Sequence, residues 1–247
     1  MSRSQDIDAI LSSWPFQPGV ITARMVRASN GREVLQMRIE LGLLQMETAG
    51  RPDGEHPGGQ TTYLDYLQQS ADDLGEEFSL SEEQAVEVDR EFLQYYHRRV
   101  CWLALREFAR AVEDADHTLA LMDFVAAHAP NAEWALSHEQ YRPFVLFHRT
   151  QAGALAKLDH DSAEAAIEEV NGGLERIRAV FQAVEAEEHF EQDEFVKQLM
   201  ELRDWIREHY HVGRTLFEQL ADAVAKEQYE LAARLRDEIA RRRGPEP

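Results

Sequence analysis

The sequence has almost no cysteine, no long apolar run and a shortage of basic side chains. Cys101 is the single cysteine among 247 residues, which excludes an internal disulfide and a cysteine-based zinc site. No stretch is both long and apolar enough to span a membrane. Lys and Arg total 26 against 46 Asp and Glu, a formal net charge of −20. Because such a field repels phosphates, we expect neither duplex DNA nor an anionic membrane as the main partner.

The motifs of the common enzyme classes are missing as well. The sequence contains no glycine-rich phosphate loop, no Gly-x-Ser-x-Gly elbow and no His-Glu-x-x-His helix. We therefore expect a non-catalytic protein with no cofactor and no bound metal. The first ten residues carry charges where a signal peptide needs its apolar core, which favours a cytoplasmic location.

One metal site can be constructed from the acidic stretch that follows Phe181. Glu185, His189 and Asp193 are spaced four residues apart and would share one face of a helix. A carboxylate-bridged site with two metals needs such pairs from several helices, and this stretch supplies them from one helix only. We favour a solvated acidic face for this stretch.

The remaining composition is that of a globular, mainly α-helical chain, with 44% hydrophobic and 9% aromatic residues. Changes in pattern divide it into four segments. These are an N-terminal segment over 1–80 with a β-hairpin and a Gly/Pro-rich loop, a helical domain over 81–182, an acidic amphipathic connecting helix over 183–212, and a helical hairpin over 213–247.

The N-terminal β-hairpin is predicted from two strand-like arms around a turn signal. Residues 20–28 and 33–43 flank Ser29-Asn30-Gly31, where Asn and Gly tolerate a positive φ. Apolar and polar residues alternate along the second arm, so one face should meet a core and the other water. The alternating residues are Leu35, Met37, Ile39 and Leu41 with Gln36, Arg38 and Glu40. Because two strands alone are marginal, the hairpin should pack on helices, gain a third strand or pair with a copy of itself.

Residues 49–59 form a loop rich in glycine and proline. Its polar residues Arg51, Asp53, Glu55 and His56 could hold a ligand on a bent backbone. The loop lacks the glycine spacing of a phosphate site. We therefore favour a plain connection to a helix that starts near Thr61.

The chain from Ser81 onward has helical periodicity. A long helix through Tyr95 and Trp102 leads into Phe108-x-x-Ala111, with Leu119 further on. This spacing resembles the tetratricopeptide helix-turn-helix repeat, and a second, degenerate copy lies between Tyr141 and Phe181. Its matching residues are Ala166, Gly173 and Leu174. A helix with apolar residues on one side then reaches about Tyr210, and these residues are Phe195, Leu199, Leu202 and Ile206.

The last 28 or so residues carry the most specific pattern. Apolar residues recur at helical spacing on both sides of a polar break at 226–228, which predicts a two-helix hairpin. They are Leu216, Leu220 and Val224 before the break, and Tyr229, Ala232, Leu235 and Ile239 after it. Ala232 and Ala233 are small enough to let two helix backbones approach closely.

The stretch from Tyr229 to Ile239, with its Ala232-Ala233 and Leu235-Arg236-Asp237 groups, closely resembles the UVR motif of the excision-repair proteins UvrB and UvrC. The resemblance implies a protein-interaction element that pairs with a second such hairpin or another surface and performs no catalysis. The residues that we expect to contact a partner are Leu216, Leu220, Tyr229, Ala232, Ala233, Leu235, Arg236, Asp237 and Ile239.

Three functions stay open at this level. The first and favoured one is an adaptor that binds a partner protein through the hairpin. The second is a repair-associated or nucleic-acid-linked protein, and the third is a regulator of an enzyme such as a kinase. The residues also leave open whether the hairpin packs on its own chain, on a partner or on a second copy, since a short hairpin cannot bury its apolar side alone.

Overall fold

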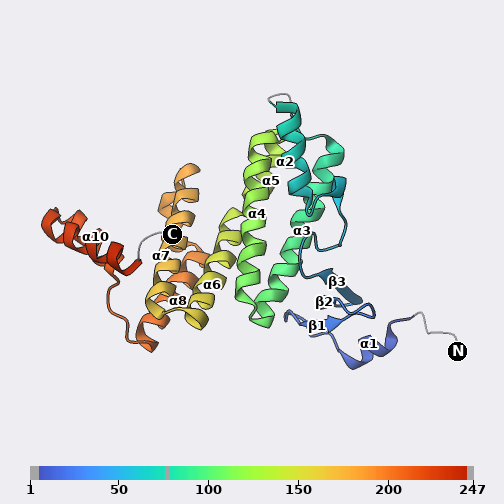
Figure 1. The fold of residues 1–247 in the computed structure, drawn as a ribbon, viewed down its shortest axis with the longest axis horizontal. Coiled ribbons are helices and arrows are strands. Elements are labelled where there is room, and N and C mark those ends of the chain that lie inside the picture. The colour runs from blue at the N-terminus through green and yellow to red at the C-terminus, as the bar shows by residue number, and fades with distance from the viewer. Residues whose placement is uncertain (1–5, 76–77, 244–247) are drawn as a thin grey trace. The chain divides into compact units, whose positions relative to one another are not determined.

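The computed structural model describes residues 6–75 and 78–243 and confirms a mainly α-helical chain with a small N-terminal sheet (Figure 1). The chain divides into two compact units, Met1–Ala152 and Gly153–Pro247, and the boundary between them falls inside one helix. The predicted division into four segments stays a prediction.

The first unit holds the sheet and the helices that follow it. Its elements are α1 (Asp8–Ser13), β1 (Ala23–Arg27), β2 (Glu33–Ile39), β3 (Gly42–Glu47), the short 3₁₀ helix η1 (Pro57–Gly59), α2 (Tyr63–Leu74), α3 (Glu82–Leu105), α4 (Phe108–His128), α5 (Ala132–Glu139) and the first part of α6 (Arg142–His160). The second unit holds the rest of α6, α7 (Ala163–Ala183), the 3₁₀ helix η3 (Glu187–Gln192), α8 (Glu194–His209), α9 (Leu216–Ala225) and α10 (Tyr229–Arg243).

The N-terminal sheet is antiparallel in the order β1-β2-β3. The predicted turn between β1 and β2 is present, with Gly31 at a φ of 87°. The second predicted arm is not continuous, because the chain reverses after Ile39 and returns as β3. Leu41, predicted to face the core, lies in this reversal and is 89% exposed. The hairpin therefore gains a third strand, and β1 and β2 also lie against α3.

The prediction that the polar residues of β2 face water is wrong. Gln36 and Arg38 are each only 7% exposed. Gln36 accepts a hydrogen bond from Arg24 at 2.9 Å and donates one to Gln45 at 3.0 Å, which links all three strands. Arg38 donates to the backbone oxygen of Trp14 at 2.8 Å. The N-terminal segment thus covers the polar face, and hydrogen bonds replace the water that alternation alone would predict.

The Gly/Pro-rich loop is a connection that α3 holds in place. Tyr95 and Arg98 of α3 both donate to the backbone oxygen of Gly50, at 3.1 and 2.8 Å. Arg51 is buried and pairs with Glu87 of α3 at 2.7 Å and with Asp53 at 3.3 Å. Carboxylates of the loop and of α3 thus neutralise its guanidinium, which favours a plain connection over a ligand site.

The helix after the loop begins at Tyr63, capped by Thr62, close to the predicted start near Thr61. A fully buried carboxylate of α3 meets this helix end. Glu91 accepts hydrogen bonds from the backbone N–H groups of Tyr63 and Leu64, at 2.7 and 3.0 Å. His117 of α4 lies 3.0 Å from the same carboxylate. Because a helix N-terminus carries unsatisfied N–H groups and partial positive charge, Glu91 joins α2, α3 and α4.

Helices α3 and α4 form the long helical hairpin that the sequence predicts from Ser81. A capping box at Ser81 starts α3, and Arg106 in the left-handed region (φ 62°) ends it. Arg98 and Asp114 form a buried ion pair at 2.7 Å between the two helices. Together α3 and α4 span residues 82–128, longer than the roughly 34-residue tetratricopeptide unit.

The second predicted tetratricopeptide copy corresponds to α6 and α7. Ala166 and Leu174 are buried, as the pattern requires. Helix α7 also packs on α8, which follows it in the chain. Val196, Leu199 and Ile206 form the buried side of α8, so the predicted amphipathic helix is present.

Candidate functional site

The C-terminal hairpin consists of α9 and α10. A capping box begins α9, in which the carboxylate of Glu218 accepts from the N–H of Thr215 at 2.9 Å and the Thr215 hydroxyl accepts from the N–H of Glu218 at 3.2 Å. The chain reverses at 226–228, where Glu227 has a φ of 57° and the N–H of Gln228 donates to the oxygen of Ala223 at 2.8 Å. The predicted hairpin and the position of its break are confirmed, although the turn contains no glycine.

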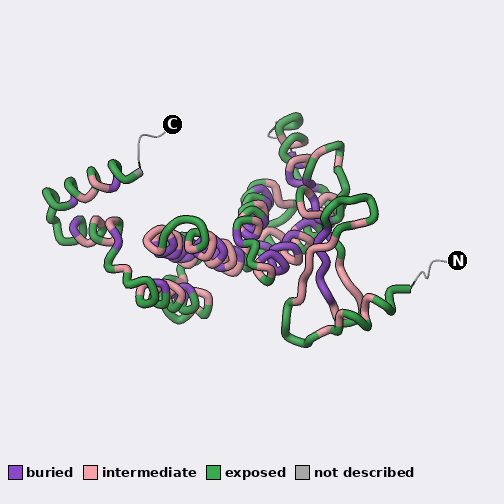
Figure 2. Tube along the Cα trace, turned by 60° about the horizontal axis from the view of Figure 1, so that its bottom comes forward, coloured by how far each residue is buried: buried purple, intermediate pink, exposed green. Residues whose placement is uncertain are grey.

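The least exposed side chains of α9 and α10 are small or aliphatic. Ala223 is 1% exposed, and Ala232 and Ile239 are each 8% exposed. Leu216, Leu220 and Leu235 are half-buried. Figure 2 shows the buried positions of this hairpin as isolated segments on a mostly exposed pair of helices.

The predicted apolar stripe of α9 is wrong at its last member. Val224 is 53% exposed, whereas its neighbour Ala223 is buried. Two turns of an α-helix take about seven residues. Ala223, seven residues after Leu216, therefore lies on the same side of α9 as Leu216. Val224, eight residues after Leu216, is rotated away from that side.

The outer face of α10 carries the remaining residues predicted to bind a partner. Tyr229 is 69% exposed, and Ala233, Arg236 and Ala240 are exposed at one-turn intervals beyond it. We call Tyr229, Ala233, Arg236 and Ala240 the outer stripe. Asp237 is exposed beside it. The structure thus separates the predicted binding residues into an interior set and an exposed set, and their role in binding stays a prediction.

Four arginines of α10 pair with three carboxylates of the same helix. The pairs are Arg234 with Glu230 at 2.6 Å, Arg236 with Asp237 at 3.0 Å, Arg241 with Glu238 at 2.6 Å and Arg242 with Glu238 at 3.1 Å. Each pair is exposed and contributes little to stability. Their effect on the surface is to lower the positive field that phosphate binding would need.

Polar contacts attach the base of the hairpin to the preceding helices of the second unit. Glu218 accepts from Arg207 of α8 at 2.6 Å and from Asn171 of α7 at 3.1 Å. The Thr215 hydroxyl donates to Glu168 of α7. Although burial alone raises the pKa of Glu218, the bonds from Thr215, Arg207 and Asn171 hold that pKa below its ordinary value. Glu218 is therefore a charged anchor.

A groove remains beside this anchor. It measures about 670 Å³, and its apolar lining includes Leu174 and Phe190 from the body and Phe217 from α9. A second groove of about 580 Å³ lies between the hairpin residues Phe217 and Ile239 and the start of α7. The hairpin consequently rests on its own unit through polar contacts near its base, with open space beside them.

The metal site constructed from the sequence does not form. The chain leaves the helix at Ala183, Glu185 adopts a φ of 55° and residues 187–192 are a 3₁₀ helix. Glu185, His189 and Asp193 therefore do not share one α-helical face. Asp193 instead caps α8, accepting from the N–H of Phe195 at 2.9 Å. Within residues 6–75 and 78–243 no group of three or more His, Cys, Asp or Glu side chains is arranged to hold a metal.

Two residues of the anchor were missed among the predicted site residues. Thr215 and Glu218 form the pattern Thr-x-x-Glu, which is a known helix-start signal and could have been found from the sequence. The contacts of Glu218 with Arg207 and Asn171 give no such signal, because they depend on how α7 and α8 approach the hairpin.

Comparison with known families matches the same segment. The UvrB/uvrC motif (UVR) matches residues 214–242, which confirms the resemblance predicted for this hairpin. No family match covers the helical body, so its tetratricopeptide-like character stays a prediction. No curated protein and no solved structure matches the chain. The chain thus carries a C-terminal UVR hairpin on a helical body, and none of its described helices has the length and apolar character needed to cross a membrane.

Proposed function

We propose that this protein is a non-catalytic adaptor that binds a partner protein through the outer stripe of its UVR hairpin. The observation that carries the proposal is the exposed stripe on α10, which offers one large aromatic side chain, Tyr229, followed by the small residues Ala233 and Ala240. Such a surface lets a partner helix approach closely while Tyr229 supplies the contact area typical of interface hot spots.

The attachment of the hairpin supports binding of a partner over packing on its own chain alone. The least exposed side chains of α9 and α10 are small or aliphatic, yet Tyr229 and Val224 at the turn remain largely exposed. The base is held by the polar contacts of Glu218 and Thr215. The base of the hairpin is thus attached to the body, while the turn is exposed and can contact a second protein.

The nucleic-acid alternative gains no support from this surface. Four arginines of α10 have carboxylate partners in the same helix, and the whole chain has a formal charge of −20. Regulation of an enzyme would require that this enzyme be the bound partner. The capture experiment described next would identify it.

The test is affinity capture from lysate with the full chain and with a version ending at Val212. A protein retained by the full chain and lost from the shorter version identifies the partner. The full-length variant Ala233→Arg, which places a bulky charge in the outer stripe, should lose that protein. The matched control Ala126→Arg changes an exposed alanine of α4 and should retain it.

Two results would contradict the proposal. Equal retention by the full chain and the shorter version would show that the hairpin is not the binding element. Retention by Ala233→Arg of a protein that the shorter version loses would place the interface elsewhere on the hairpin. Sedimentation of the full chain and Ala233→Arg separates self-association from binding of a different protein.

A further inference from the structure

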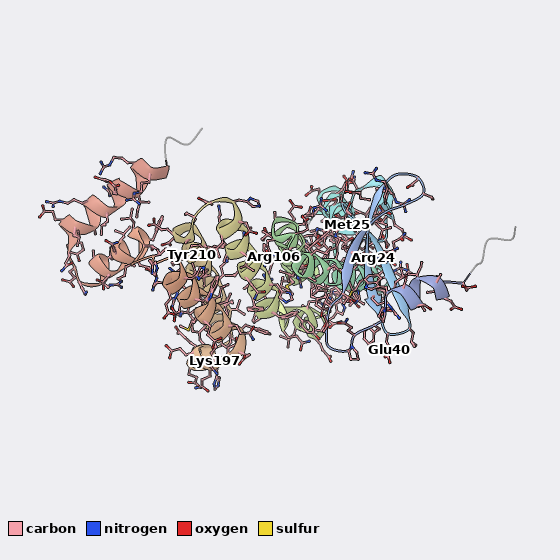
Figure 3. All side chains as sticks on the ribbon, turned by 90° about the horizontal axis from the view of Figure 1, so that it is seen from below. Arg24, Met25, Glu40, Arg106, Lys197 and Tyr210 are labelled. Carbon is pink, nitrogen blue, oxygen red and sulfur yellow. The ribbon has the colours of Figure 1, made fainter. Side chains whose placement is uncertain are left out.

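Helix α8 exposes a cluster of aromatic side chains that the UVR hairpin does not use. Trp205 is 50% exposed and Tyr210, labelled in Figure 3, is 47% exposed. The imidazole of His209 stacks on the indole of Trp205 with a centroid distance of 5.0 Å and an interplanar angle of 12°. Tyr210 meets the indole edge-on at 6.2 Å. We call Trp205, His209 and Tyr210 the aromatic patch.

Folding of α8 does not require this patch. The buried side of the helix is formed by Val196, Leu199 and Ile206, and the half-exposed Trp205 is not part of it. With His209 stacked on the indole, half of the Trp205 side chain still remains exposed and is available to a ligand. A tryptophan that stays half-exposed is an unusual use of the largest apolar side chain and is typical of binding surfaces.

Carboxylates surround the aromatic patch on the same helix face. Three exposed acidic residues lie close to Trp205 in the sequence. They are Glu201, four residues before it, Asp204, directly before it, and Glu208, three residues after it. Asp204 contacts the adjacent Arg203 at 3.5 Å. Among the residues that the structure describes, Glu201 and Glu208 have no ion-pair partner. These exposed negative charges favour a cationic ligand over an anionic one.

Two other tryptophans of the chain have an arginine side chain over the ring. The guanidinium of Arg24 lies 4.2 Å from the ring centroid of Trp14, and that of Arg110 lies 4.8 Å from the ring of Trp102. Trp205 has no such arginine within the described part of the chain. An arginine can stack its planar group on an indole and at the same time donate hydrogen bonds to a nearby carboxylate.

We infer that the aromatic patch, with Glu201 and Glu208, is a second protein-binding surface that receives an arginine-bearing segment of a partner. One guanidinium stacks on the exposed part of the Trp205 indole and donates to the flanking carboxylates. Further arginines spaced one helical turn along the segment lie near Glu201 and Glu208. This surface is separate from the outer stripe of α10, and its existence does not depend on the function proposed for the hairpin.

The test measures binding of the full chain to two labelled synthetic helical peptides, one with arginines at one-turn spacing and one with glutamines in their place. The full chain should bind the arginine peptide and not the glutamine peptide. Trp205→Ala should weaken binding about two- to fivefold, the range expected for an exposed cation–π contact. Trp205→Tyr should recover part of that loss. Circular dichroism checks that each variant keeps the helical content of the wild type.

Charge-matched variants separate this surface from the general acidity of the chain. Glu201→Gln with Glu208→Gln should weaken binding and reduce its salt dependence. Glu185→Gln with Glu188→Gln removes the same charge from exposed positions outside α8 and should have little effect. The inference would be overturned if the two double variants lost binding equally. It would also be overturned if Trp205→Ala bound the arginine peptide as the wild type does, or if the full chain did not bind this peptide. Self-association that Trp205→Ala abolishes, without peptide binding, would assign the patch to a second copy and also overturn it.

Discussion

Arg207 donates to Glu218 at 2.6 Å, and this contact joins the last turn of α8 to the first turn of α9. The same carboxylate closes the capping box with Thr215 and accepts from Asn171 of α7. One side chain therefore begins the UVR hairpin and also attaches it to the body of the second unit.

We predict that Glu218→Gln loosens the hairpin without unfolding the body. The amide can still serve the capping box, but the charge-assisted bond from Arg207 is lost. Since Arg207 is partly exposed, the expected cost is about 1 kcal/mol, which corresponds to roughly fivefold faster hydrogen exchange of α9 and α10 amides. Glu227→Gln, in the exposed turn, is the control. Unchanged exchange in Glu218→Gln would show that the hairpin is held by other contacts.

The same anchor predicts a pH dependence. Burial raises the pKa of Glu218, but its hydrogen-bond donors outweigh that effect and hold the pKa below the ordinary value of 4.5. A carboxylate with a depressed pKa stabilises the folded state above its unfolded pKa, and this contribution is lost as the pH falls through the folded pKa. Attachment of the hairpin should therefore persist at neutral pH and weaken only in acid.

The pH prediction is checked by following the backbone amide proton of Thr215 by NMR as the pH is lowered. Its chemical shift should change with a midpoint below 4.5, because its N–H donates directly to Glu218. Glu218→Gln should remove the transition. A midpoint at or above the ordinary value would contradict the anchor role.

Local patterns predicted the elements better than they predicted the contacts between them. The capping residue Ser81, the Asn30-Gly31 turn and the break at 226–228 act within a few residues, and each is where the sequence placed it. The burial of Gln36 and Arg38 was not predictable, because it depends on Trp14, which lies before the hairpin, and on Gln45 of the third strand. Alternation shows which face of a strand a residue occupies but not what covers that face.

The candidate site shows the same limit. The spacing of α10 identified the interior residues Ala232 and Ile239, which are buried. The exposure of Tyr229 could not be read from the same periodicity, because the residue follows the turn directly and α9 ends before it. The residue types predict that α10 is a helix. Which of its apolar side chains stay exposed depends on where α9 ends, because α9 covers only the part of α10 that lies beside it.

Cys101 should be inert towards alkylating reagents in the folded protein. Burial raises the pKa of its thiol to about 12, and the side chain is fully buried in α3. Because the thiolate is the reactive form, iodoacetamide at neutral pH should modify the chain only after denaturation. Mass spectrometry with and without denaturant measures this. Rapid labelling of the native protein would show that α3 opens readily.

The buried carboxylate of Glu91 should be a sensitive position of the first unit. Glu91→Ala would leave the N–H groups of Tyr63 and Leu64 without their side-chain acceptor and would remove the partner of His117. Removing one member of a buried charged network typically costs about 3–5 kcal/mol. Glu91→Gln retains one acceptor oxygen and should cost less, about 1–3 kcal/mol.

The measurement is urea unfolding of the full chain, followed by the fluorescence of its tryptophans. The midpoint should fall in the order wild type, Glu91→Gln, Glu91→Ala. Glu113→Gln is the matched control, because it removes an exposed carboxylate from α4 and should leave the midpoint unchanged. If Glu91→Ala unfolds with the midpoint of Glu113→Gln, water must replace the lost acceptor at the start of α2, and the carboxylate would not be what joins α2, α3 and α4.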